Sequence, residues 1–102
     1  MRFELRFQFH LSGASELTVQ VFDATAQDNR HIRLAHLPQN RWVTQCLDFA
    51  RDSQRNDGTA NSPFTAGNLV DDVFVFVEGD SAKTATLFVD ELVLFDAGIA
   101  SP

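Results

Sequence analysis

The sequence predicts an all-β fold and, within that class, an antiparallel β-sandwich. Apolar and polar side chains alternate at every second position through most of the chain, which is the pattern of strands with one buried face. No stretch keeps the 3.6-residue spacing of an amphipathic helix. Clusters of Gly, Ser, Pro, Asp and Asn separate the alternating stretches, and short strands between such turns are typical of sandwiches and barrels.

The first half of the chain predicts four strands. The first spans residues 2–11, where five apolar side chains, three of them Phe, share one face and polar side chains occupy the other. The turn "SGAS" ends it, and the turns "AQDN" and "PQN" separate the strands that follow. These later strands are expected at residues 16–23, 30–37 and 41–49.

The second half predicts one long loop and two further strands. Residues 50–68 are polar and rich in Asp, Asn, Ser and Gly, so we expect a loop there, with Phe64 tucked inward. Strands are expected at residues 70–79 and 85–96, and a flexible tail at 97–102. Both strands are apolar on both faces. We therefore expect a loop, a neighbouring domain or a second copy of the chain to cover the second face.

Composition narrows the class of protein. A chain of 102 residues predicts one domain, 1–102, and 44% hydrophobic residues are enough for a folded core. The net charge of −6 argues against nucleic acid as a partner, and no apolar run reaches the roughly 20 residues of a membrane helix. The lone Cys46 excludes an internal disulfide. Ten Phe, one Trp and no Tyr indicate side chains that mostly fill the core.

The charges are divided along the chain. Seven of the eight basic residues lie at or before Arg55, and eight acidic residues follow Asn56 beside the single Lys83. Because the last strand of a sandwich often pairs near the first, we expect Arg2 or Arg6 to face an acidic residue of the last strand. Such a cross-strand pair contributes about 0.2–1 kcal/mol.

Three segments carry a resemblance to a known family: "NRHIRLAHLPQNRWVTQCLDF", "NLVDDVFVFVEG" and "TLFVDELVLFD". In chain order, the segments contain a strand, a turn with Pro, a strand that starts with Trp, a strand with Asp-Asp and a final strand with Val-Asp-Glu. This order resembles that of the galactose-binding-like jelly-roll domains. This family includes many carbohydrate-binding modules of polysaccharide-degrading enzymes. The likeness spans residues 17–96. The chain departs from the family in two ways. It has about six recognisable strands, so the usual N-terminal strands are expected to be missing or supplied by a partner. It also lacks the many Trp and Tyr residues that typical sugar-binding surfaces have.

The resemblance implies a jelly roll without catalysis, often with one structural calcium ion. In the family, the Asp of the final Val-Asp pair often helps to bind calcium, and Asp90 is the matching position. The residues themselves leave alternatives open, because a buried carboxylate is also satisfied by a salt bridge or by backbone hydrogen bonds, and the side chain could simply be exposed to water. Period-two alternation places Asp90 with Phe88, Leu92 and Leu94 on one face, with Glu91 opposite. The two carboxylates then cannot flank one glycosidic bond.

Six residues are candidates for ligand binding: Trp42, Arg6, Gln8, His31, Arg33 and Asp72. Trp42 starts a strand, and it either stacks on a sugar ring or plugs the end of the sandwich. Polar side chains of the first and third predicted strands would form a groove if the two strands shared a sheet; otherwise they form solvated faces. This set comprises Arg6, Gln8, His10, His31 and Arg33. Asp72 either accepts hydrogen bonds from sugar hydroxyls or caps backbone groups.

The sequence therefore predicts a non-catalytic module that binds a polysaccharide or oligosaccharide as part of a larger polysaccharide-active protein. The alternative is a structural domain that packs on a neighbouring domain of a parent enzyme or forms a homo-oligomer. No Ser or Cys lies in a nucleophile motif. The compartment stays open, and an extracellular or periplasmic location is expected if the module belongs to a secreted enzyme.

Overall fold

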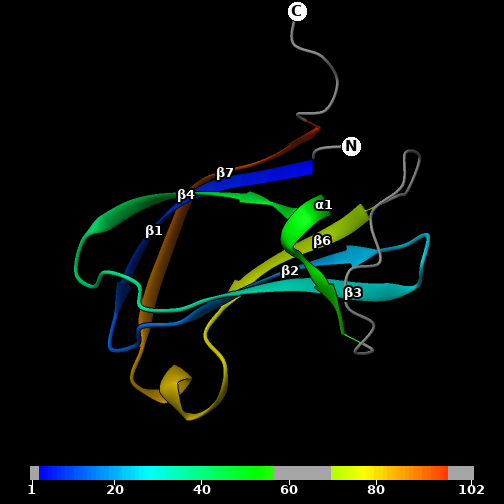
Figure 1. The fold of residues 1–102 in the computed structure, drawn as a ribbon. Coiled ribbons are helices and arrows are strands. Elements are labelled where there is room, and N and C mark those ends of the chain that lie inside the picture. Colours follow the sequence, from blue (N-terminus) through cyan, green and yellow to red (C-terminus); the bar gives the residue numbers. More distant parts are fainter. Residues whose placement is uncertain (1–2, 57–69, 97–102) are drawn as a thin grey trace, which may run out of the picture.

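The computed structural model describes residues 3–56 and 70–96, which form two antiparallel sheets (Figure 1). The first sheet has the strand order β4-β1-β7, with β1 at Phe3–Ser12, β4 at Trp42–Asp48 and β7 at Thr86–Asp96. The second sheet has the order β5-β3-β2-β6. Its strands are β2 at Leu17–Asp23, β3 at Asp28–Leu34, β5 at Gln54–Arg55 and β6 at Val70–Phe76. The all-β sandwich is thereby confirmed.

All six predicted strands are present, and two short elements overlap the start of the predicted loop 50–68, the first of them beginning at residue 49, the last of the predicted fourth strand. Residues 49–52 form the helical turn α1 (Phe49–Asp52), and Gln54–Arg55 pairs with β3 as β5. The turn begins at residue 49 because the Asp48 carboxylate accepts a hydrogen bond from Arg51 N–H, as an N-cap residue does. A 3₁₀ turn, η1, spans Gly79–Lys83 between the last two strands. The rest of the predicted loop, with Phe64, and the predicted tail lie outside the described residues.

The core lies between β1 and β2, the strands with the clearest alternation. The inner side chains of β1 are fully buried, and those of β2 nearly so; they are Leu5, Phe7, Phe9, Leu11, Leu17, Val19 and Val21. Leu47 and Phe49 complete the buried cluster from the end of β4 and the start of α1. Burial of each large apolar side chain contributes about 1.5–3 kcal/mol, so this pair of strands supplies most of the packing energy.

One charged pair is also buried, at the hairpin between β2 and β3. Asp23 and Arg30 are almost completely inaccessible, and Arg30 Nε lies 3.2 Å from Asp23 Oδ2. Asp23 Oδ1 also accepts a hydrogen bond from Ala26 N–H at 3.1 Å, which closes the turn. Strand register explains the position of Arg30, since it lies directly opposite the buried Val21 and so faces inward.

The edge strands β6 and β7 each contain a β-bulge at a pair of acidic residues. The register of β2 with β6 skips Asp72, and that of β1 with β7 shifts between Asp90 and Val93. Asp72 and Glu91 have positive φ angles of 48° and 51°. In each bulge the preceding Asp accepts a hydrogen bond from the next backbone N–H at 2.8 Å, Asp71 from Asp72 and Asp90 from Glu91. Bulges on edge strands hinder pairing with further strands.

The bulge in β7 corrects the predicted faces of the last strand. Asp90 and Phe88 lie opposite Gln8 and His10 on the outer face, as alternation predicts, but Leu94 lies opposite the buried Leu5 on the inner face. The expectation that Leu94 shares the face of Asp90 is wrong, because the extra residue of the bulge reverses the alternation beyond it.

The predicted pairing of the last strand with the first is confirmed, since β7 lies beside β1. Arg6 lies directly opposite Val93 of β7 and Cys46 of β4. The second apolar faces of β6 and β7 are uncovered by other described residues, as shown by the exposed side chains of Phe74, Phe88 and Val93, which the register places on the outer faces. No helix among the described residues is long and apolar enough to cross a membrane.

Candidate functional site

The outer face of the first sheet carries an aromatic row that crosses all three strands. Trp42 of β4 lies opposite His10 of β1, and His10 lies opposite Phe88 of β7. Directly opposed residues of antiparallel strands project from the same face, and the neighbouring Phe9 points into the core. The three rings therefore project outward, away from the second sheet.

The rings of this row contact one another edge to face. The ring centroids of His10 and Trp42 are 5.7 Å apart with planes inclined by 64°, and those of His10 and Phe88 are 6.2 Å apart at 70°. His10 Nδ1 is buried with no hydrogen-bond partner among the described residues, so packing between its two neighbours positions the ring. Trp42 is 53% exposed and Phe88 is 57% exposed. Trp42 therefore does not plug the end of the sandwich.

A polar row lies beside the aromatic row on the same face. The register places Thr44 opposite Gln8 and Gln8 opposite Asp90, two residues along each strand from Trp42, His10 and Phe88. These side chains offer a hydroxyl, an amide and a carboxylate. We call the six residues of the two rows the platform. Arg6 lies one further step along β1, at the edge of the platform.

Two other predicted ligand residues, His31 and Arg33, lie on the outer face of the second sheet. They are opposite Gln20 and Thr18 of β2. The predicted groove that joins them to Arg6 and Gln8 therefore does not form, because β1 and β3 belong to different sheets.

His31 and Arg33 form a continuous polar network. Arg33 Nε lies 3.3 Å from Glu78 Oε2, and Arg33 Nη1 lies 3.2 Å from His31 Nε2. His31 Nδ1 contacts Asn56 Oδ1, and Asn56 Nδ2 donates to Gln20 Oε1 at 3.1 Å. The hydrogen bond from Arg33 holds the pKa of Glu78 below its ordinary value. These groups are therefore engaged mainly with one another.

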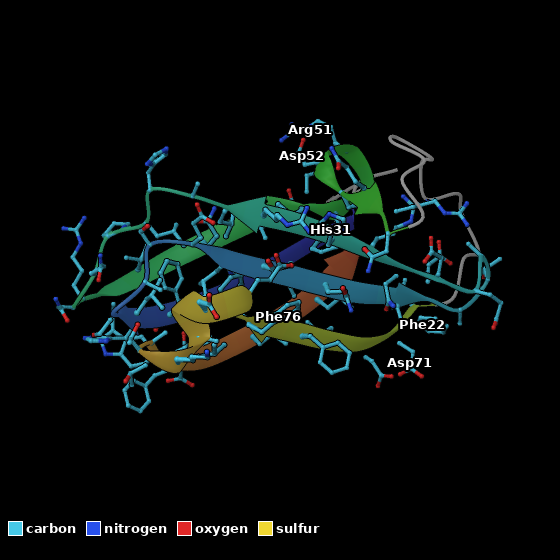
Figure 2. The ribbon with its side chains drawn as sticks, turned by 90° about the horizontal axis from the view of Figure 1, so that it is seen from below. Phe22, His31, Arg51, Asp52, Asp71 and Phe76 are labelled. Carbon is cyan, nitrogen blue, oxygen red and sulfur yellow. The ribbon has the colours of Figure 1, made fainter. Side chains whose placement is uncertain are left out.

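A shallow hollow of about 320 Å³ adjoins this network, lined by His31, Ile32, Arg33, Asp52 and Gln54. Figure 2 shows His31 on the same side of the molecule as Asp52 and Arg51 of α1. A bidentate contact with Arg51 lowers the pKa of Asp52, with Nε–Oδ1 and Nη2–Oδ2 distances of 2.8 Å. Four of the five lining residues are polar, and the apolar one, Ile32, is half-buried.

Asp72 lies apart from both groups of residues. It is the exposed bulge residue of β6, and the neighbouring Asp71 pairs with Phe22 at the end of the sheet distant from Phe76 (Figure 2). The structure thus brings Trp42, Gln8 and Arg6 together on one face. It places His31 and Arg33 on the opposite face, and Asp72 at an edge.

Asp90 is exposed and belongs to the platform. Calcium takes six to eight oxygen ligands. The residue directly opposite Asp90 is Gln8, and among the described residues no three Asp, Glu, His or Cys side chains form a metal-binding group. These residues do not make a calcium site by themselves.

The calcium prediction has a direct test in thermal melting with EDTA and then with added calcium. A site at Asp90 would raise the melting temperature by several degrees when calcium is added, because calcium would bind the native state preferentially. From the residues around Asp90 we expect no shift, and we expect Asp90→Asn to behave in the same way. A calcium-dependent rise that Asp90→Asn abolishes would contradict this expectation.

Phe88 and Thr44 are the platform residues that sequence reasoning missed. The available signal for Phe88 is the apolar character of both faces of β7, which predicts a covering loop, a neighbouring domain or a second copy of the chain. Comparisons of the chain with protein-family models, with curated proteins and with solved structures find no match. The resemblance to galactose-binding-like domains therefore stays a prediction.

Proposed function

We propose that this protein is a non-catalytic carbohydrate-binding module and that the platform is its binding face. The observation that carries the proposal is the pair of exposed rings, Trp42 and Phe88, beside a row of hydrogen-bonding side chains. A sugar ring has an apolar C–H face and a rim of hydroxyl groups, so it is recognised by a flat aromatic ring beside polar groups. Strands hold such groups more precisely than loops do.

Trp42→Ala is expected to abolish or strongly reduce polysaccharide binding. The substitution removes the largest exposed ring while leaving β4 and the buried core intact. Affinity gel electrophoresis against a panel of soluble polysaccharides measures the effect as loss of retardation. Phe74→Ala is the matched control, because Phe74 is 49% exposed and lies on the second sheet. The proposal fails if no polysaccharide retards the unmodified protein, or if both variants lose retardation equally.

A second candidate function is assembly, through a surface on β7. Leu92 and Val93 are exposed at the bulge, and apolar side chains that remain exposed together often mark an interface. The partner would be a second copy or a neighbouring domain of a parent enzyme. If a second copy binds there, sedimentation should show dimers whose fraction rises with protein concentration. Leu92→Lys should convert these dimers to monomers. The control Ala82→Lys, on the exposed 3₁₀ turn, should leave the dimers unchanged. A monomer at every concentration would exclude self-association.

A further inference from the structure

We infer that the platform binds an extended, neutral, β-1,4-linked glycan chain that runs across the strands. This inference rests on the proposed function and specifies the shape, direction and charge of the ligand. It depends on three features of the platform: the separation of the two exposed rings, the position of the polar row, and the charge of the surrounding surface.

The separation of the rings indicates contact with two sugars of one chain. Trp42 and Phe88 are on β4 and β7, with β1 between them. Two strand spacings amount to about 10 Å. In an extended β-1,4-linked chain, successive sugars are turned over, so every second sugar presents the same face. The repeat of two sugars is close to the distance between the two strands, which lets sugars n and n+2 lie over Trp42 and Phe88.

The polar row fits the edge of the same chain. Thr44, Gln8 and Asp90 lie about 7 Å along the strands from the aromatic row and parallel to it. In a flat chain of linked sugars, the hydroxyl groups project from the two edges. A chain whose faces lie on the aromatic row therefore directs one edge of hydroxyl groups toward the polar row. Asp90 accepts one backbone hydrogen bond, and a carboxylate has capacity for further donors.

The charge of the surface favours a neutral chain. Asp90 lies in the polar row, and Glu91 follows it as the exposed bulge residue. The whole chain has a net charge of −6. A polysaccharide with carboxylate or sulfate groups would be repelled by these charges, whereas neutral hydroxyl groups donate to them. Arg6 lies one further step along β1 from the polar row.

Isothermal titration calorimetry with defined oligosaccharides tests the inference. Cellohexaose is expected to bind at least about tenfold more tightly than cellobiose, because two sugars cannot reach both rings; tenfold corresponds to about 1.4 kcal/mol. Trp42→Ala and Phe88→Ala should each reduce the affinity for cellohexaose to the level of cellobiose. Phe74→Ala should leave it unchanged. Maltohexaose, an α-1,4-linked chain of equal length that curves, should bind no better than cellobiose.

The outcomes separate this inference from the proposed function. Equal affinity for cellohexaose and maltohexaose, affinity that does not depend on length, or full binding by Phe88→Ala would overturn the inference. Retardation only by polysaccharides of the panel that are charged or not β-1,4-linked would also overturn it and leave the proposed function standing. If no glycan of any kind binds, both fail. Unchanged circular dichroism and melting temperature of each variant confirm that lost binding does not reflect lost folding.

Discussion

Asp23→Ala is expected to lower the free energy of unfolding by about 3–5 kcal/mol, because it leaves the buried guanidinium of Arg30 without its carboxylate. The substitution also removes the acceptor for Ala26 N–H, which closes the turn between β2 and β3. For a domain of about 100 residues, a loss of this size lowers the melting temperature by more than about 10 °C. Urea unfolding measured by circular dichroism gives the free energy directly.

A charge pair on the surface is the matched control for this experiment. Arg51 Nε lies 2.8 Å from Asp52 Oδ1, and both side chains are exposed to water. Asp52→Ala should therefore lower the free energy of unfolding by less than about 1 kcal/mol. A second variant separates the buried charge from the turn. Arg30→Met in the Asp23→Ala background should restore part of the lost stability, because the buried guanidinium that lost its Asp23 carboxylate is then gone. If Asp23→Ala lowers the free energy of unfolding no more than Asp52→Ala does, the buried pair does not stabilise the fold.

Gly13→Ala is expected to destabilise the fold by about 3 kcal/mol, from crowding and from its left-handed backbone. Gly13 has a φ angle of 80° in the turn between β1 and β2. A Cβ atom there would lie 2.1 Å from the carbonyl oxygen of Thr84 and 3.3 Å from the Cα of Ala85, just before β7. These are backbone atoms, so a side-chain rotation cannot relieve the contact. The turn or the start of β7 must move.

Gly79→Ala is the control that isolates the backbone contribution. Gly79 has a similar φ angle of 67°, but nothing lies within 4 Å of the position of its Cβ atom. Gly79→Ala should lower the free energy of unfolding only by the roughly 1–2 kcal/mol that a residue with a side chain loses in the left-handed backbone conformation. Chemical denaturation of both variants measures the difference. If the two variants lose equal amounts of stability, the turn between β1 and β2 does not pack closely against the Thr84 carbonyl group in solution.

The strands and their inner faces could be predicted because the alternation of apolar and polar side chains at every second position depends only on residues that are neighbours in the sequence. In β1, the alternation of Phe7 and Phe9 with Gln8 indicates both the strand and the side that enters the core. The same reasoning failed in β7. There the pair Asp90 and Glu91 forms a bulge, and alternation alone does not reveal an extra residue.

Arg30 and α1 show a second limit of local reasoning. Arg30 occupies an inward position of β3, where a charge is tolerated only because Asp23 lies across the hairpin. The turn at Phe49–Asp52 lies in a stretch that reads as polar loop, and the burial of Phe49 in the core accompanies it. Both features depend on partners that the alternation pattern does not identify.

The candidate site was predictable only in part. Trp42, Gln8 and Arg6 were candidates from residue type and position, whereas Phe88 was not, because an exposed Phe in a strand looks like any other apolar residue. Its role became visible only when β7 was found beside β1, with Phe88 opposite His10. His31 has the same residue type as His10 but lies on the other sheet.

The sequence by itself determined where the six long strands run and, except beyond the bulge of β7, which of their side chains face the core, since both follow from neighbours along the chain. The tertiary structure alone decided which strands share a sheet, and therefore that Trp42 and Phe88 lie on one face while His31 lies on the other. The physical reason is that strand order and register are set by contacts between residues distant in sequence. Single bulges and buried charges change those contacts without changing the local pattern.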